Sequence, residues 1–299
     1  MKSRSNELRR ARPLLGTIVE LVVDGLGKKA ARAAMADAFA VVAEVQRRMS
    51  WHDPASVLSR INREAAERAV EVDDWTFAVL SAAAEMHRVS AGVFDVTIAP
   101  HLEALGFLPA TGALRGAASF TDVELRPDRT VRFRRPCMRI DLGGIAKGFA
   151  VDQAVAALQR SGVPRGLVNA GGDLRAFGDG GFPVAIRHPD DPRATLTTVA
   201  LKNAALATSA HYYADRLVPG CTAGPIIDPQ SGAQARRIRT ATVRAETAML
   251  ADALTKVVML AGETALPTLT HFHADAIFVA TGAEALCSPG WNATLHLPS

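Results

Sequence analysis

The chain has 299 residues, of which 48% are hydrophobic and 21% charged, as is typical of a folded globular protein with a substantial core. Its net charge is +4, but only 5% of its residues are aromatic and no stacking motif accompanies the basic ones. This composition disfavours nucleic-acid binding. No apolar run reaches the roughly 18 residues that a membrane span needs, so we expect no stable membrane insertion.

The N-terminus is basic, and we expect a flexible tail over residues 1–12, followed by one folded domain over residues 13–299. Arg9-Arg10 has the appearance of a twin-arginine export signal, but the apolar stretch after it carries Glu20 and lacks a cleavage site. The three cysteines are odd in number and lack metal-ligand spacing, which argues against a disulfide framework. These features predict a reduced, cytoplasmic protein.

The first half of the chain shows both helical and strand patterns. Residues 15–23 alternate as a strand, and residues 28–49 predict an Ala-rich amphipathic helix. A second helix is expected over residues 75–90 and ends at Ala91-Gly92. Residues 106–135 are interrupted by Gly, Pro and Asp, which predicts short strands in a flap or a junction between two lobes.

The segment 139–178 is the most informative part of the sequence. It predicts a strand ending at Asp141, a Gly143-Gly144 turn, a helix over residues 147–160, and a strand over residues 166–169 that leads into Gly171-Gly172. A glycine turn that opens onto a helix N-terminus can present backbone N–H groups to a phosphate. The pattern also fits an ordinary β-α-β unit, because no GxGxxG or P-loop motif is present.

The C-terminal part predicts more strands and one clear helix. Residues 182–187 and 195–201 alternate as a hairpin, residues 247–260 predict a helix, and residues 276–279 with 294–297 are expected to close the sheet. Because strands and helices mix without strict alternation, the expected fold class is α+β.

The chain also carries a series of short motifs in a fixed order. They are Leu15-Gly16-Thr17, MSWHD (49–53), LSRIN (58–62), GVFDVT (92–97), LGF (105–107), the segment 139–178, ATS (207–209), IIDP (226–229) and ADAL (251–254). In order and spacing this series resembles the ApbE family, the FAD:protein FMN transferases. The resemblance covers roughly residues 14–262 and implies mixed sheets with flanking helices, in two intertwined lobes around a flavin cleft.

The resemblance implies a reaction and a set of FAD contacts. FAD would be cleaved, FMN would pass to a Thr hydroxyl of an acceptor protein, and AMP would be released. The implied FAD contacts are Leu15, Trp51, Val93, Phe94, Asp95, Gly143, Lys147 and Ile226. Taken alone, Trp51 fits a core anchor as well as a ring contact. Lys147 opposes the helix dipole, which favours an anionic partner, although an exposed lysine gives the same pattern.

The family also implies a magnesium ion on the diphosphate. Here the resemblance assigns its ligands to Asp252 and to the backbone carbonyls of Ala146 and Thr255. Magnesium suits so few ligands because it keeps waters and takes further oxygens from substrate phosphates. Without the resemblance, Asp252 fits a solvated or capping carboxylate.

Two departures from the family pattern lie at the expected site of chemistry. Lys256 replaces the hydroxyl ligand that usually follows the Asp by four residues, and an ammonium group cannot coordinate a metal. Pro225 replaces the His that usually precedes IIDP, and proline cannot transfer a proton. Lys256 could replace the ion on the diphosphate, or swing aside so that Asp252 still recruits magnesium.

Two functions therefore remain open. One is a working FMN transferase, and the other is a catalytically impaired FAD-binding protein of the same fold. The nearly intact flavin-contact motifs favour the transferase. The sequence identifies neither a catalytic side chain nor the acceptor protein.

Overall fold

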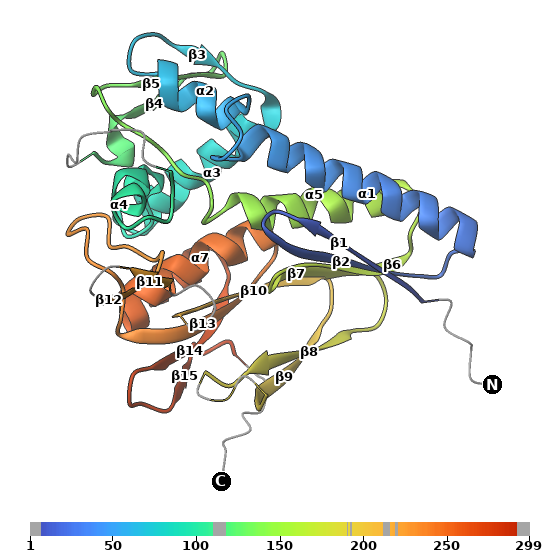
Figure 1. The fold of residues 1–299 in the computed structure, drawn as a ribbon. Coiled ribbons are helices and arrows are strands. Elements are labelled where there is room, and N and C mark those ends of the chain that lie inside the picture. Colours follow the sequence, from blue (N-terminus) through green and yellow to red (C-terminus); the bar gives the residue numbers. More distant parts are fainter. Residues whose placement is uncertain are drawn as a thin grey trace.

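A computed structural model describes residues 7–109, 118–189, 191, 193–211, 216–218 and 221–291. Its centre is an eight-stranded, wholly antiparallel sheet with the order β1-β2-β6-β7-β10-β13-β14-β15 (Figure 1). The strands are β1 (Leu8–Leu14), β2 (Thr17–Asp24), β6 (Arg165–Ala170), β7 (Asp173–Phe177), β10 (Ala204–Ala210), β13 (Ile238–Ala245), β14 (Asp275–Ala280) and β15 (Ala285–Cys287).

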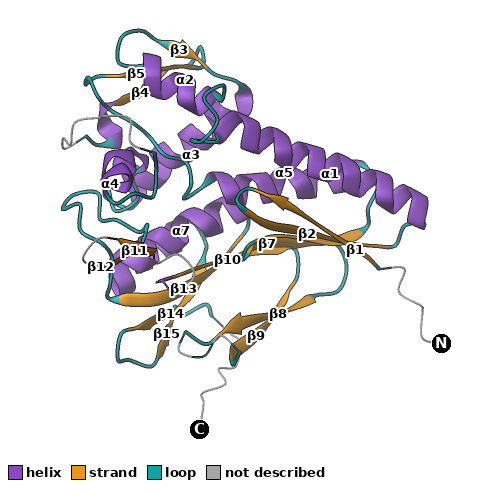
Figure 2. Cartoon of the chain, in the orientation of Figure 1, coloured by secondary structure: helices purple, strands orange, loops and turns teal. Residues whose placement is uncertain are grey.

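Three helices cover one face of this sheet, and a hairpin lies on the other (Figure 2). The helices are α1 (Lys28–Met49), α5 (Ala146–Arg160) and α7 (Ala248–Ala261), and the hairpin strands are β8 (Phe182–Arg187) and β9 (Thr195–Leu201). The buried positions of α1 recur every three or four residues, which places one apolar stripe against the core. They are Ala31, Ala34, Met35, Ala38, Phe39, Val42, Val45 and Met49.

The remaining α-helices and strands lie in two places. Those between residues 57 and 133 form a smaller region beside the helical face, and the others belong to the C-terminal part of the chain (Figure 1). Together, these elements are α2 (Val57–Glu64), β3 (Val70–Glu71), α3 (Asp74–Val89), α4 (Ala99–Ala104), β4 (Val123–Leu125), β5 (Thr130–Phe133), β11 (Arg216–Val218), β12 (Cys221–Ala223) and α8 (Leu266–His271). Strands β3, β5 and β4 pair as a separate antiparallel sheet. None of the described helices is both long and apolar enough to cross a membrane.

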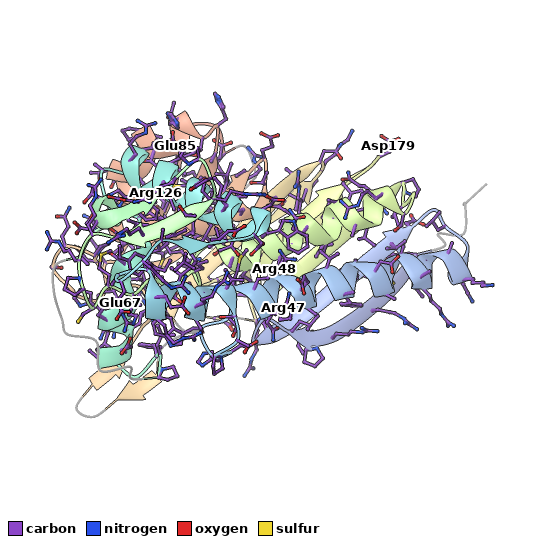
Figure 3. All side chains as sticks on the ribbon, turned by 90° about the horizontal axis from the view of Figure 1, so that it is seen from above. Arg47, Arg48, Glu67, Glu85, Arg126 and Asp179 are labelled. Atoms are coloured by element: carbon purple, nitrogen blue, oxygen red, sulfur yellow. The ribbon has the colours of Figure 1, made fainter. Side chains whose placement is uncertain are left out.

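Arg48, which is labelled in Figure 3, lies near the end of α1 and joins this helix to the smaller region. Its guanidinium pairs with Asp73 and stacks over the ring of Trp75, 4.7 Å from the ring centroid. Asp73 also caps α3 by accepting the N–H groups of Trp75 and Thr76 at 3.1 and 3.2 Å. One arginine therefore fixes the start of α3 against α1, whose last residue, Met49, lies two positions before Trp51.

The α+β class is confirmed, and α1 and the hairpin β8–β9 occupy the predicted residues. The prediction of a strand ending at Asp141 was wrong. The segment forms no strand ladder, and its backbone bonds to other partners: Asn62 pairs with both backbone groups of Ile140 at 2.9 Å, and Asp141 N donates to Val96 O at 2.8 Å. The segment 139–178 is therefore no β-α-β unit.

Of three further expectations, the structure contradicts one, and the other two fall wholly or partly on residues outside the description. Residues 8–12, which we expected in a flexible tail, pair along β2 as part of β1. The expected strand at residues 294–297 lies outside the described residues, and β15 pairs with β14 at this end of the sheet. In the expected flap, residues 110–117 are also outside the description, whereas β4 and β5 pair with each other.

Candidate functional site

A cleft of about 1380 Å³ opens where the sheet edge, the end of α1, the segment 93–98 and the α5 N-terminus meet. All of the FAD contacts implied by the sequence line it: Leu15, Trp51, Val93, Phe94, Asp95, Gly143, Lys147 and Ile226. Of the expected metal ligands, Ala146 lines the cleft, whereas Asp252 and Thr255 lie behind its wall with 0% exposure. Segments far apart in sequence thus converge on a single cavity.

Leu15 reaches the cleft through a strained turn. Leu15 and Gly16 both have positive φ, 56° and 69°, and join β1 to β2 as a two-residue hairpin. A leucine in this region costs roughly 1–2 kcal/mol. The backbone N–H of Leu15 donates to Gln46 Oε1 on α1 at 2.6 Å, which holds the turn against the helix. The sequence placed Leu15 at the start of a strand, so the turn geometry is a correction.

Asp95 shapes the wall that carries Phe94. Its Oδ1 accepts Thr97 N at 2.8 Å and Thr97 Oγ1 at 2.7 Å, and its Oδ2 accepts Phe120 N at 2.9 Å. Burial opposes its charge, but hydrogen bonds from His87 and Thr97 outweigh this effect and lower the pKa of Asp95. We therefore assign Asp95 as an ionised group that holds the wall in place through its hydrogen bonds.

His87, which the sequence reasoning missed, supports the cleft wall through Asp95 and Phe94 and does not itself line the cleft. Its Nδ1 lies 3.2 Å from Asp95 Oδ2 and 3.1 Å from the carbonyl oxygen of Phe94, so Nδ1 carries a proton and donates to both acceptors. The hydrogen bond to Asp95 is the main cause that raises the pKa of His87, against the effect of burial. Its place in the last turn of the predicted helix, just before GVFDVT, was the available signal.

The two glycine pairs lie on the cleft wall. A Cβ on Gly171 would lie 2.4 Å from Thr17 Oγ1, and its φ of 63° adds a second reason for glycine at this β6–β7 turn. A Cβ on Gly144 would lie 3.5 Å from Lys256 Cε and 3.7 Å from the Phe94 ring. The Gly143-Gly144 turn therefore meets both an ammonium-bearing side chain and an aromatic ring.

Two lysines and two aspartates form a charge network beside this turn. Lys147 at the start of α5 pairs with buried Asp173, and Lys256 pairs with fully buried Asp252. Burial opposes the charge of Lys147, but Asp173 and Asp252 raise its pKa nonetheless. Burial also opposes the charge of Asp252, but both lysines lower its pKa. Burial, followed by the Asp252 charge, raises the pKa of Asp173 to about 6.

The oxygens of Asp252 are already engaged by donors. Oδ1 accepts the Lys256 ammonium, and Oδ2 accepts Gly148 N at 3.1 Å. Its carbonyl oxygen accepts Lys256 Nζ at 3.1 Å and Thr255 Oγ1 at 2.7 Å. Within the described residues, no group of three or more His, Cys, Asp and Glu side chains could hold a metal ion. With an ammonium group on Oδ1 and a backbone N–H on Oδ2, the Asp252 carboxylate itself does not fit a divalent cation in this arrangement.

Comparison with known proteins identifies the family of this chain. The model of the ApbE family matches residues 15–278. The chain belongs to the ApbE family. The resemblance seen in the motifs is thereby confirmed.

Two bacterial relatives named FAD:protein FMN transferase support this assignment. The protein of Rhodobacter capsulatus is 31% identical over 275 residues, which cover 86% of this chain and 52% of the relative. The protein of Vibrio cholerae is 30% identical over 236 residues, which cover 74% of this chain and 71% of the relative. The chain therefore spans only about half the length of the Rhodobacter relative.

Solved ApbE structures share the fold. The ApbE protein of Thermotoga maritima superposes with a TM-score of 0.85 at 28% identity, over 96% of this chain and 97% of its own. The flavin transferase ApbE from Vibrio cholerae gives a TM-score of 0.83 at 22% identity, over 95% of this chain and 98% of its own. The second likeness concerns the fold alone.

Proposed function

We propose that this ApbE-family protein is an FAD:protein FMN transferase, with the cleft as its FAD site. The observation that carries the proposal is the convergence of all eight expected contacts on one cavity of about 1380 Å³. A cavity of this size exceeds the range typical of small-molecule sites, about 300–1,000 Å³, and leaves room for a dinucleotide. The names of the relatives supply the reaction class.

The chemistry of the wall matches the parts of FAD. Trp51, Phe94 and Ile226 offer aromatic and apolar surface for a ring system, and all three line the cleft. Lys147 at the α5 N-terminus and Lys256 beside Gly144 offer positive charge for the diphosphate. In this arrangement FMN, with a single phosphate, forms fewer contacts than FAD.

The proposed reaction is a displacement at phosphorus. The hydroxyl oxygen of an acceptor Thr forms a bond to the phosphorus of the FMN half. The bond from that phosphorus to the bridging oxygen breaks, and AMP leaves with the bonding electron pair. The hydroxyl proton passes to solvent or to the departing phosphate. The protein's contribution is to position the diphosphate and to offset its charge.

One incubation tests the proposal. The full chain is mixed with FAD, magnesium and an acceptor protein that carries a flavinylation motif. AMP release and an increase in acceptor mass by one FMN are the expected results. Omitting FAD, or replacing the acceptor Thr by Val, controls for adventitious flavin. FAD binding with neither product would contradict transfer.

Pro225 supports a second candidate function, namely FAD binding without turnover. It lines the cleft where the family usually carries His, and it has no side-chain proton to transfer. General acid–base assistance is typically worth about 10²–10⁴ in rate. The same incubation separates the candidates, because a carrier protein binds FAD but releases no AMP.

A further inference from the structure

We propose that the ammonium group of Lys256 takes the place of a divalent cation in this chain, so that the diphosphate of FAD is bound without metal. The inference rests on the proposed FAD site. It differs from what the family resemblance implies, namely that a magnesium ion would offset the charge of the diphosphate. It is carried by three observations on Lys256: its partners, its direction and the limited room around it.

The partners of Lys256 occupy the position where a metal would bind. Its ammonium contacts both Oδ1 and the backbone carbonyl of Asp252, the latter at 3.1 Å. An ion coordinated by Asp252 Oδ1 would have to displace this ammonium and then remain close to a like charge. The other carboxylate oxygen, Oδ2, accepts the N–H of Gly148 at 3.1 Å, so it offers no easy alternative.

The Lys256 side chain is oriented so that its ammonium group can still donate a hydrogen bond to a ligand in the cleft. An ammonium group has three N–H donors, and two of these face Asp252, so one remains for an oxygen in the cleft. Lys256 lines the cleft, and its Cε lies next to Gly144 in the glycine turn. Lys147 lines the same cleft, and among the described residues its ammonium has a single acceptor, Asp173.

The surroundings restrict the lysine stem. The Lys256 side chain is 22% exposed, so most of its stem is covered by neighbouring atoms. Swinging aside would break one hydrogen bond to the fully buried carboxylate of Asp252 and one to its backbone carbonyl oxygen. Asp252 would then lose its nearest counter-charge. The Lys256 ammonium therefore occupies the position beside Asp252 more readily than a free metal ion would.

The test measures FAD affinity of the full chain by calorimetry, in EDTA and in millimolar magnesium. We expect the two dissociation constants to agree within about threefold, well under the tenfold step that corresponds to 1.4 kcal/mol. Lys256→Thr should bind FAD at least about tenfold more weakly in EDTA and regain affinity with magnesium. Lys202→Met, which removes an exposed lysine away from the cleft, should match the unmodified protein.

A second readout detects the metal itself. Manganese titrated into the FAD complex should keep its free electron paramagnetic resonance signal with the unmodified chain and lose it with Lys256→Thr. Stoichiometric manganese binding by the unmodified chain, or a magnesium-dependent gain in FAD affinity above tenfold, would overturn the inference. If Lys256→Thr does not fold, these two measurements on the unmodified chain still decide it. Absence of FAD binding under both conditions would instead refute the proposed function.

Discussion

Replacing Gly148 by Ala tests how the crossing of α5 and α7 supports the site. Gly148 lies in the first turn of α5, where the two helices meet. A Cβ at this position would lie 2.1 Å from the carbonyl oxygen of Ala248, 2.5 Å from its carbonyl carbon and 2.8 Å from Met249 Cα. These are backbone atoms that cannot rotate away, so the helices themselves must separate by about 1 Å to restore ordinary contact.

The size of the effect follows from three contributions. Alanine in a helix gains about 1 kcal/mol over glycine. Overpacking of a close contact costs about 1–3 kcal/mol. Separation also stretches the bond from Gly148 N to Asp252 Oδ2 and the two 2.9 Å bonds that Asp152 accepts from α7. Losing one bond to a charged group costs about 1.5–3 kcal/mol. The expected net destabilisation is about 3 kcal/mol.

Thermal unfolding measures this destabilisation directly. At about 2–4 °C per kcal/mol for a chain of this size, Gly148→Ala should lower Tm by about 6–12 °C. FAD affinity should fall as well, because Asp252 and Lys256 move relative to Lys147. Gly181→Ala is the matched control, since Gly181 is exposed and its Cβ would meet only ordinary contacts from 3.4 Å. A Tm within about 2 °C of the unmodified protein would refute the argument that this crossing requires glycine.

Three further changes address the wall of the cleft and its support. Trp51→Ala should weaken FAD binding by about 1–3 kcal/mol, the scale for stacking a base-like ring, and unchanged affinity by calorimetry would remove Trp51 from the site. The hydrogen bond to Asp95 raises the pKa of His87 above 6.5, so the stability that this pair adds is complete below about pH 6.5 and is lost as the pH rises through the folded-state pKa. The Tm of the unmodified protein should therefore fall above pH 6.5 more steeply than that of His87→Gln, and parallel profiles would contradict the pairing. Asn62→Ala leaves the buried N–H and carbonyl of Ile140 without partners and should cost about 2–4 kcal/mol in chemical denaturation; a loss under about 1 kcal/mol would exclude the hydrogen-bond explanation.

Local sequence patterns correctly predicted the elements in which the pattern itself specifies the buried face. The apolar stripe of residues 28–49 and the alternation of residues 182–187 each specify a buried face, so helix and strand followed. Strand β1 could not be predicted in this way. Its sequence, LRRARPL, has five exposed residues in its centre, and it forms by pairing with β2 along its whole length. Exposed edge strands carry little periodic signal.

The prediction of a strand before the glycine turn failed for a related reason. Residues 139–141 have strand-like composition, but the side chain of Asn62, 78 positions earlier, takes the place of a neighbouring strand. Similarly, the pairing of Lys147 with Asp173 joins positions 26 apart, and only the folded chain brings them together. Motifs indicated which residues line the cleft, while the charge partners depended on tertiary packing.

The two departures from the family pattern affect different steps of the proposed function. Lys256 lines the cleft beside the proposed diphosphate position and brings one positive charge, bonded to Asp252. One ammonium can hold a bound diphosphate, but it offsets less of the charge that develops on a leaving phosphate than a divalent ion does. Pro225 adds no polar group to the cleft wall. Both departures therefore spare FAD binding more than the rate of transfer, so affinity and turnover in this chain must be measured separately.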